Sequence, residues 1–174
     1  MASKEPEFSL VNRVGNIEIR NYPPMIIAEV SVAGTMEAAS SNGFRMIADF
    51  IFGNNTAKSG KSEKIDMTVP VVISKNKGTW SLHFVMPAQY SLEDLPKPNN
   101  PQLRIKQVKD RRVAVLRFSG SVNENKFNAK AAELIDWIKS EHLKMLGNPE
   151  LARYNPPWTL PFMRRNEVMI DLAN

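Results

Sequence analysis

Histidine is the side chain that most often acts as an acid, a base or a metal ligand near neutral pH, and the chain has two histidines. His83 lies among residues that are apolar at alternate positions from Trp80 to Met86, so its side chain is expected to face solvent. His142 follows a helical pattern, where an imidazolium suits the helix dipole. The two are not at metal-ligand spacing and there is no cysteine. We therefore expect no metal site.

The carboxylates are scattered except at Glu167, which follows Asn166 and the pair Arg164-Arg165. This cluster could be a structural network that satisfies the polar groups of a loop, or Glu167 could act as a general base. The sequence has no Gly-x-Ser-x-Gly elbow, no phosphate-binding glycine loop and no zincin motif. We therefore predict no catalytic residue and no enzyme activity, with a base at Glu167 as the alternative.

The elements that must position these side chains repeat within the chain. Residues 17–34 and 103–120 align without a gap at an offset of 86 (103 minus 17), and both alternate apolar and polar residues up to a glycine. Period-2 alternation predicts half-buried strands. Pro23-Pro24 and Lys109-Asp110 are expected to supply the turns between them.

A helix and further strands follow each of these strand pairs. Apolar residues at helical spacing predict one helix around residues 44–51 and another around 127–138. Strands are expected at 65–73, 80–86 and 166–172. The chain is therefore predicted to be α+β, with a strand–strand–helix–strand–strand unit present twice in a largely antiparallel sheet.

The two repeats are expected to form one domain over residues 1–174, with halves at about 17–86 and 103–172. Three loops are predicted, at 53–64, at 87–101 between the halves, and at 148–165 before the last strand. The third contains the sequence YNPPWTLPFMRR, and a loop with so many large apolar groups must pack down or hold something.

Composition restricts the classes of function. The 174 residues are 43% apolar and 24% charged, as in ordinary folded domains. The net charge of +5 is small and the Lys and Arg residues are dispersed, so no nucleic-acid partner is expected. No apolar run is long enough to span a membrane, and residues 1–10 lack the apolar core of a signal peptide. We therefore expect a cytoplasmic protein.

The first predicted helix is apolar around most of its circumference, with a narrow polar strip near Arg45 and Asp49. Such a helix needs cover beyond one sheet, or it exposes an apolar patch. The aromatic-rich loop from Tyr154 to Met163 could provide that cover and complete the core. Alternatively, helix and loop could form a flat apolar pocket rimmed by arginines, which suits a planar ligand with carboxylates on its edge.

Six segments, in order along residues 17–172, carry a resemblance to a known family. They read IEIRNY, NGFRMIADFIFGNN, KIDMTVPV, FVMPAQYSLEDLPKPNNP, VAVLRFSG and YNPPWTLPFMRRNEVMIDL. With them the chain resembles the SOUL haem-binding family. The resemblance implies a distorted eight-stranded antiparallel barrel with two helices. It also implies reversible, non-covalent binding of haem or another tetrapyrrole in an apolar groove between the first helix and the loop before the last strand.

The resemblance also implies which residues form the site. One branch of the family is proposed to use an axial histidine just before the tyrosine of the first strand, and the matching position here is Asn21. The other branch lines its pocket from the first helix, at positions that match Ser41, Phe44, Ala48 and Asp49. An iron ligand would come from the four remaining candidates: His83, His142, Tyr154 or Met163.

The resulting candidate site has three parts. The floor is expected from the first helix and the lid from the loop, and arginines are candidates for the haem propionates. The alternative function is a binding module for another apolar small molecule or a protein partner, without haem. The candidates are Ser41, Phe44, Ile47, Ala48 and Ile51 for the floor; Trp158, Leu160, Phe162 and Met163 for the lid; and Arg45, Arg164 and Arg165 for the propionates.

Overall fold

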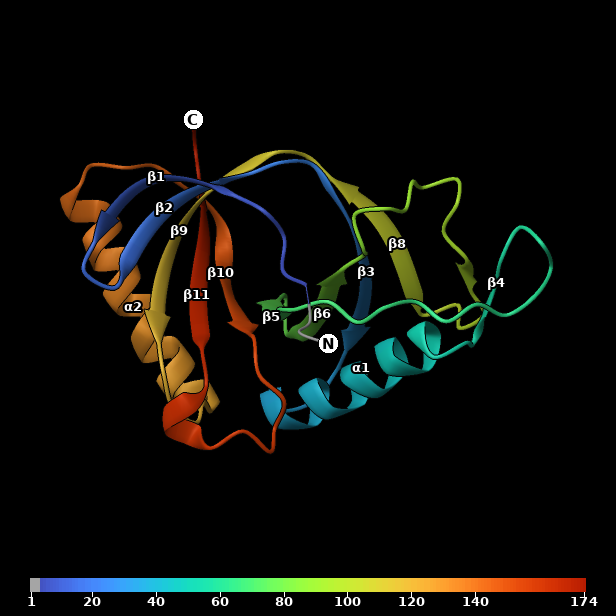
Figure 1. The fold of residues 1–174 in the computed structure, drawn as a ribbon. Helices are drawn as coiled ribbons and strands as arrows, with labels where there is room; N and C mark the ends of the chain where they lie inside the picture. The colour runs from blue at the N-terminus through green and yellow to red at the C-terminus, as the bar shows by residue number, and fades with distance from the viewer. Residues whose placement is uncertain (1–3) are drawn as a thin grey trace. The chain divides into compact units, whose positions relative to one another are not determined.

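The computed structural model describes residues 4–174, which divide into two compact units (Figure 1). The first unit comprises residues 4–6 and 24–109, and the second comprises residues 7–23 and 110–174. The boundary falls at the two turns predicted from sequence, at Pro23-Pro24 and Lys109-Asp110. The division therefore separates the two strands of each predicted pair.

The first unit is an antiparallel sheet of four strands with one helix against it (Figure 1). The strand order is β5-β6-β3-β8, and helix α1 packs on β3 and β6. Two further short strands, β4 and β7, pair with each other. The bounds are β3 (Met25–Val32), α1 (Met36–Ile51), β4 (Asn55–Thr56), β5 (Val71–Asn76), β6 (Thr79–Val85), β7 (Lys97–Pro98) and β8 (Leu103–Val108).

Helix α1 begins where a threonine caps it, because the Thr35 side chain accepts a hydrogen bond from the Ala38 N–H at 3.2 Å. The helix lies very close to β6 at Gly43. A Cβ atom at Gly43 would stand 2.9 Å from both terminal methyl carbons of Leu82. The helix and sheet bury an apolar core between them, in which Ile47, Phe50 and Leu82 are at most 2% exposed.

The second unit is an antiparallel arrangement of five strands in the order β1-β2-β9-β11-β10, with helix α2 packed on β9, β10 and β11 (Figure 1). The Asn123 side chain caps α2 by accepting from the Lys126 N–H at 2.8 Å. The bounds are β1 (Ser9–Val14), β2 (Ile17–Tyr22), β9 (Arg111–Phe118), α2 (Glu124–Ser140), β10 (Met145–Arg153), the 3₁₀ helix η1 (Pro161–Met163) and β11 (Asn166–Leu172).

The α+β class with two helices and antiparallel strands is confirmed. The order of elements follows the predicted unit twice, as β2-β3-α1-β5-β6 and then β8-β9-α2-β10-β11. The strands of the two repeats pair with each other: β2 of the first repeat pairs with β9 of the second, and β3 of the first pairs with β8 of the second. Strand β1 was not predicted. A closed eight-stranded barrel is not confirmed: among the described residues, β1 pairs only with β2 and β8 pairs only with β3, so both strands are open edges.

Strand and loop boundaries differ from the prediction in several places. The predicted loops at 53–64 and 87–101 contain the paired strands β4 and β7, and β10 takes the first part of the loop predicted at 148–165. Conversely, the strand expected from residue 65 begins only at Val71. Pro70 has no N–H to donate to a ladder, which favours a strand that starts after it.

Candidate functional site

The candidate site begins with residues 155–163, NPPWTLPFM, which we call the apolar loop. None of its nine residues is charged. Its large side chains project into solvent: Trp158 is 83% exposed, Phe162 74%, Met163 62% and Leu160 56%. The four lid residues predicted from sequence therefore lie on one loop of the second unit. They form an exposed apolar surface of the kind that marks binding sites in folded proteins.

Hydrogen bonds to its own backbone fix the conformation of the loop. The Thr159 N–H donates to the Pro156 carbonyl at 3.1 Å, and the Met163 N–H donates to the Leu160 carbonyl at 2.9 Å. From the second unit, the Gly120 N–H donates to the Pro161 carbonyl at 3.0 Å. The proline rings fix further backbone dihedrals. The apolar side chains are thus presented by a fixed backbone.

The Arg164 side chain binds two backbone carbonyls of the apolar loop. Its Nε donates to the Thr159 carbonyl at 2.8 Å, and its Nη2 donates to the Pro157 carbonyl at 2.7 Å. The sequence predicted this guanidinium as a propionate partner, and the structure shows it bound to backbone carbonyls.

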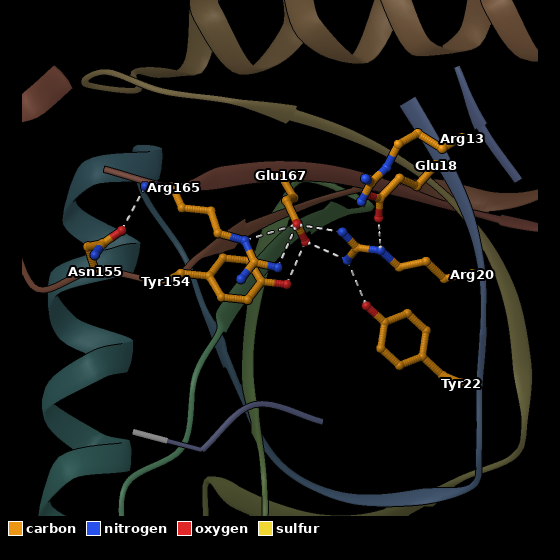
Figure 2. A network of polar contacts seen from close by, with 8 residues as sticks. All are labelled: Arg13, Glu18, Arg20, Tyr22, Tyr154, Asn155, Arg165 and Glu167. Carbon is orange, nitrogen blue, oxygen red and sulfur yellow. Dashed lines mark hydrogen bonds and ion pairs between the residues drawn. The ribbon is translucent and has the colours of Figure 1, made fainter. Parts of the chain in front are cut away.

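The two ends of the loop meet over one buried carboxylate, that of Glu167 (Figure 2). The Tyr154 N–H donates to the Arg165 carbonyl at 3.2 Å, and the Arg165 guanidinium stacks on the Tyr154 ring at 3.8 Å. The Tyr154 hydroxyl donates to Glu167 Oε2, and Arg165 Nη2 donates to Glu167 Oε1 at 2.9 Å. The Arg165 backbone N–H also donates to the Asn155 side chain at 2.7 Å.

Glu167 belongs to a network that ties β11 to β2 (Figure 2). Arg20, 1% exposed, makes a bidentate pair with fully buried Glu167 through bonds of 2.8 and 2.9 Å. The other donors of Arg20 reach Glu18 Oε2 at 2.6 Å and the Tyr22 hydroxyl at 3.0 Å. The Phe8 ring lies 4.3 Å from the Arg20 guanidinium carbon. The network joins residues 147 positions apart in the chain.

The sequence pointed to Glu167 and its neighbouring arginines but missed Glu18, Arg20 and Tyr22. The three missed residues alternate along β2 and are all buried, although alternating polar residues ordinarily mark a solvent face. A visible signal was the even spacing of an acid, a base and a phenol along one strand face. That spacing alone does not reveal a partner from β11.

The charges of the network shift its pKa values. Burial raises the pKa of Glu167, but the hydrogen bonds and positive charge of Arg20 outweigh it, and the net pKa lies below the usual value. Burial, together with the negative charge of Glu167, raises the pKa of Tyr154 well above 10. A fully buried carboxylate with a lowered pKa is a poor general base. The geometry favours the structural interpretation of this cluster over the catalytic one.

The predicted floor residues lie in the first unit, on α1. Ile47 and Ile51 are buried in the core of that unit, whereas Ala48 is half-buried and Phe44 is 40% exposed. Ser41 and Arg45 are exposed, and among the described residues Arg45 makes no hydrogen bond or ion pair. Asp49, on the polar strip of the helix, accepts a hydrogen bond from the Asn54 side chain. The prediction that these residues share a site with the apolar loop stays a prediction.

The remaining iron-ligand candidates have different surroundings. His83 is half-buried on β6, opposite Glu29 and Val72 in the ladders, and Trp80, Leu82 and Phe84 are buried on the other face as predicted. His142 is exposed, just after α2. Within residues 4–174 no three or more His, Cys, Asp or Glu side chains gather as a metal-binding group. In the same range, neither helix has the length and hydropathy to cross a membrane.

Comparison with known proteins gives one family and a shared fold. The model of the SOUL heme-binding protein family matches residues 3–171, nearly the whole chain. A search of curated proteins gave no match.

Solved structures with the same fold are distant in sequence. The C-terminal domain of EcmrR matches with a TM-score of 0.66 at 9% identity, covering 91% of this chain and 97% of that one. A hydrolase from Listeria innocua matches with a TM-score of 0.56 at 12% identity, covering 99% and 94%. SAV2435 bound to tetraphenylphosphonium matches with a TM-score of 0.50 at 11% identity, covering 91% and 94%. At these identities the likeness concerns the fold alone.

Proposed function

The chain belongs to the SOUL heme-binding protein family, and we propose that it binds haem or another tetrapyrrole reversibly, without a covalent bond and without chemistry on the ligand. The observation that carries the proposal is the apolar loop, with its four exposed side chains on a backbone fixed by hydrogen bonds. A porphyrin is a flat apolar ring, and burial of exposed aromatic and aliphatic surface favours its binding by about 25 cal/mol per Å².

The donor set of the loop restricts how iron could be held. The Tyr154 hydroxyl donates to Glu167 and its pKa is raised by burial, so a phenolate ligand is disfavoured. Met163 is 62% exposed and carries a thioether, which is an established axial ligand type. We therefore propose Met163 as the iron ligand if the iron has one from the loop.

The ligand's carboxylates need cations with free donors. Arg164 is engaged by loop carbonyls and Arg165 by Glu167. Arg45 on α1 is exposed, and among the described residues it has no partner. We propose Arg45 and the nearby Phe44 as contributors from the first helix, to be tested separately from the loop.

Titration with hemin and with iron-free protoporphyrin, followed by the Soret band, tests the proposal. Saturation at one equivalent by both ligands supports an apolar site that does not need the iron. Met163→Leu keeps the apolar volume of the side chain. If the thioether ligates the iron, this variant should weaken the binding of hemin but not that of protoporphyrin. Phe44→Asp should weaken the binding of both hemin and protoporphyrin if α1 takes part in the site. Phe52→Asp is the matched control, because Phe52 is 63% exposed in the same unit and outside the proposed site.

The alternative is a binding module for another apolar small molecule or a protein partner, without haem. Two observations favour it: no histidine lies on the apolar loop, and both arginines that follow the loop are already engaged. Failure of both tetrapyrroles to saturate the protein would overturn the haem proposal and leave this alternative.

A further inference from the structure

We infer that the apolar loop docks the protein on a phospholipid membrane surface, with its apolar side chains at the boundary of headgroups and acyl chains. This inference does not require haem binding. Trp158, Leu160, Phe162 and Met163 are each more than half exposed. Water is a poor environment for so much apolar surface, and the bilayer interface favours such side chains, tryptophan above all.

Part of the loop backbone already has hydrogen-bond partners within the protein, which suits a position at the boundary of headgroups and acyl chains. A polar group that enters the acyl region without a partner costs several kcal/mol, so each backbone group that is already paired lowers the cost of insertion. Three of the nine residues are prolines, which have no N–H. Five of the nine carbonyls already accept hydrogen bonds from the protein, namely those of Pro156, Pro157, Thr159, Leu160 and Pro161.

The charges around the loop complement an anionic membrane. The loop is held by two segments, residues 117–126 and 153–167, joined by the Gly120–Pro161 backbone hydrogen bond. Together these segments carry five Lys or Arg residues against two Glu residues, a net charge of +3. This net charge attracts anionic headgroups over a distance, and Arg164 and Arg165 contribute only their charge, because their donors are engaged within the protein. None of the five lies within the apolar loop itself.

A membrane fits the loop better than a folded protein partner does. The composition of the loop, aromatic and aliphatic tips with cations behind them, is that of interfacial membrane anchors.

Vesicle co-sedimentation of the haem-free protein tests the inference. The probes are vesicles of phosphatidylcholine alone and of phosphatidylcholine and phosphatidylserine in equal parts. Wild type should pellet with the mixed vesicles, more weakly with phosphatidylcholine, and less as salt is added. Trp158→Ser with Phe162→Ser should reduce partitioning by at least about tenfold, because both side chains lose their apolar contact with lipid. Phe52→Ser, at an aromatic of the first unit that is 63% exposed, should pellet like wild type.

Tryptophan emission provides an independent measurement. Trp80 is buried and Trp137 half-buried, so a blue shift on vesicle addition would report Trp158. Absence of pelleting and of the shift, or pelleting of the double variant at wild-type level, would overturn the inference. So would loop-dependent self-association in solution without vesicle binding, which would indicate a protein interface. Haem titration without vesicles is scored separately, so either proposal can fail alone.

Discussion

Glu167 offers the sharpest test of the physical account, through the variant Glu167→Gln. The carboxylate is fully buried and pairs with Arg20, which is 1% exposed. Removing one partner of a buried pair costs roughly 3–5 kcal/mol, because the other charge stays buried without compensation. Here Arg20 keeps Glu18 at 2.6 Å, so we expect the lower end, about 3 kcal/mol in the free energy of unfolding.

Urea unfolding followed by circular dichroism measures this loss. Glu133→Gln is the control, because Glu133 pairs with Lys130 at 3.1 Å on an exposed face of α2, and such pairs contribute at most about 1 kcal/mol. If Glu167→Gln does not fold, replacement of both Arg20 and Glu167 by Met should, since it leaves no unpaired charge between them. A loss at Glu167 no larger than at Glu133 would refute the reasoning.

The contribution of Glu167 to stability should also depend on pH in a defined direction. The pKa of Glu167 is lowered in the folded protein, so its contribution is fully present above the unfolded value of about 4.5 and is lost as pH falls through the folded pKa. The difference between wild type and Glu167→Gln should therefore be constant near neutral pH and shrink below pH 4.5. A difference that grows in acid would contradict the assignment.

Two further predictions concern the tyrosines and the contact between α1 and β6. Burial raises the pKa of the three tyrosines, Tyr22, Tyr90 and Tyr154, and a hydrogen bond to a carboxylate helps to raise that of Tyr90 to about 12. The near-ultraviolet absorbance of tyrosinate should therefore stay low at pH 10, and the stability of the fold should decrease as the pH rises above 10. Half-ionisation of the tyrosines at pH 10 in the folded protein would contradict this prediction. Gly43→Ala should destabilise by about 1 kcal/mol in urea unfolding, because overpacking against Leu82 exceeds the gain in helix propensity. Leu82→Val added to it should recover part of the loss, and a stabilised Gly43→Ala would show that the helix can move away.

The repeated unit could be predicted from sequence because its signals are local. Alternation over 17–34 and 103–120 and the helical spacing of apolar residues depend only on which side chains face a core. The crossed pairing of β2 with β9 and of β3 with β8 is not local, and no residue pattern in either strand specifies its neighbour. The closed barrel, which came from the resemblance, also depends on non-local pairing. It was not confirmed, because β1 and β8 are open edges.

The exposed loop could be predicted as a candidate site, but the hydrogen bonds that hold the loop in place could not. Trp158 and Phe162 were selected because a loop rarely carries so many apolar groups, and both are largely exposed. The arginines that follow were assigned to a ligand on their type and position. Their actual partners, loop carbonyls for Arg164 and Glu167 for Arg165, depend on how the loop turns back on itself.

The buried network explains how the loop keeps its apolar residues in water. A loop of this composition would ordinarily collapse onto the nearest core, since burial of each large apolar side chain contributes roughly 1.5–3 kcal/mol. Tyr154 at one end and Arg165 at the other both bind Glu167, which Arg20 holds from β2. Because collapse would require these buried hydrogen bonds to break, the polar network keeps the apolar surface exposed. Substitutions at Glu167 should therefore weaken ligand or membrane binding as well as stability, although the residue touches neither.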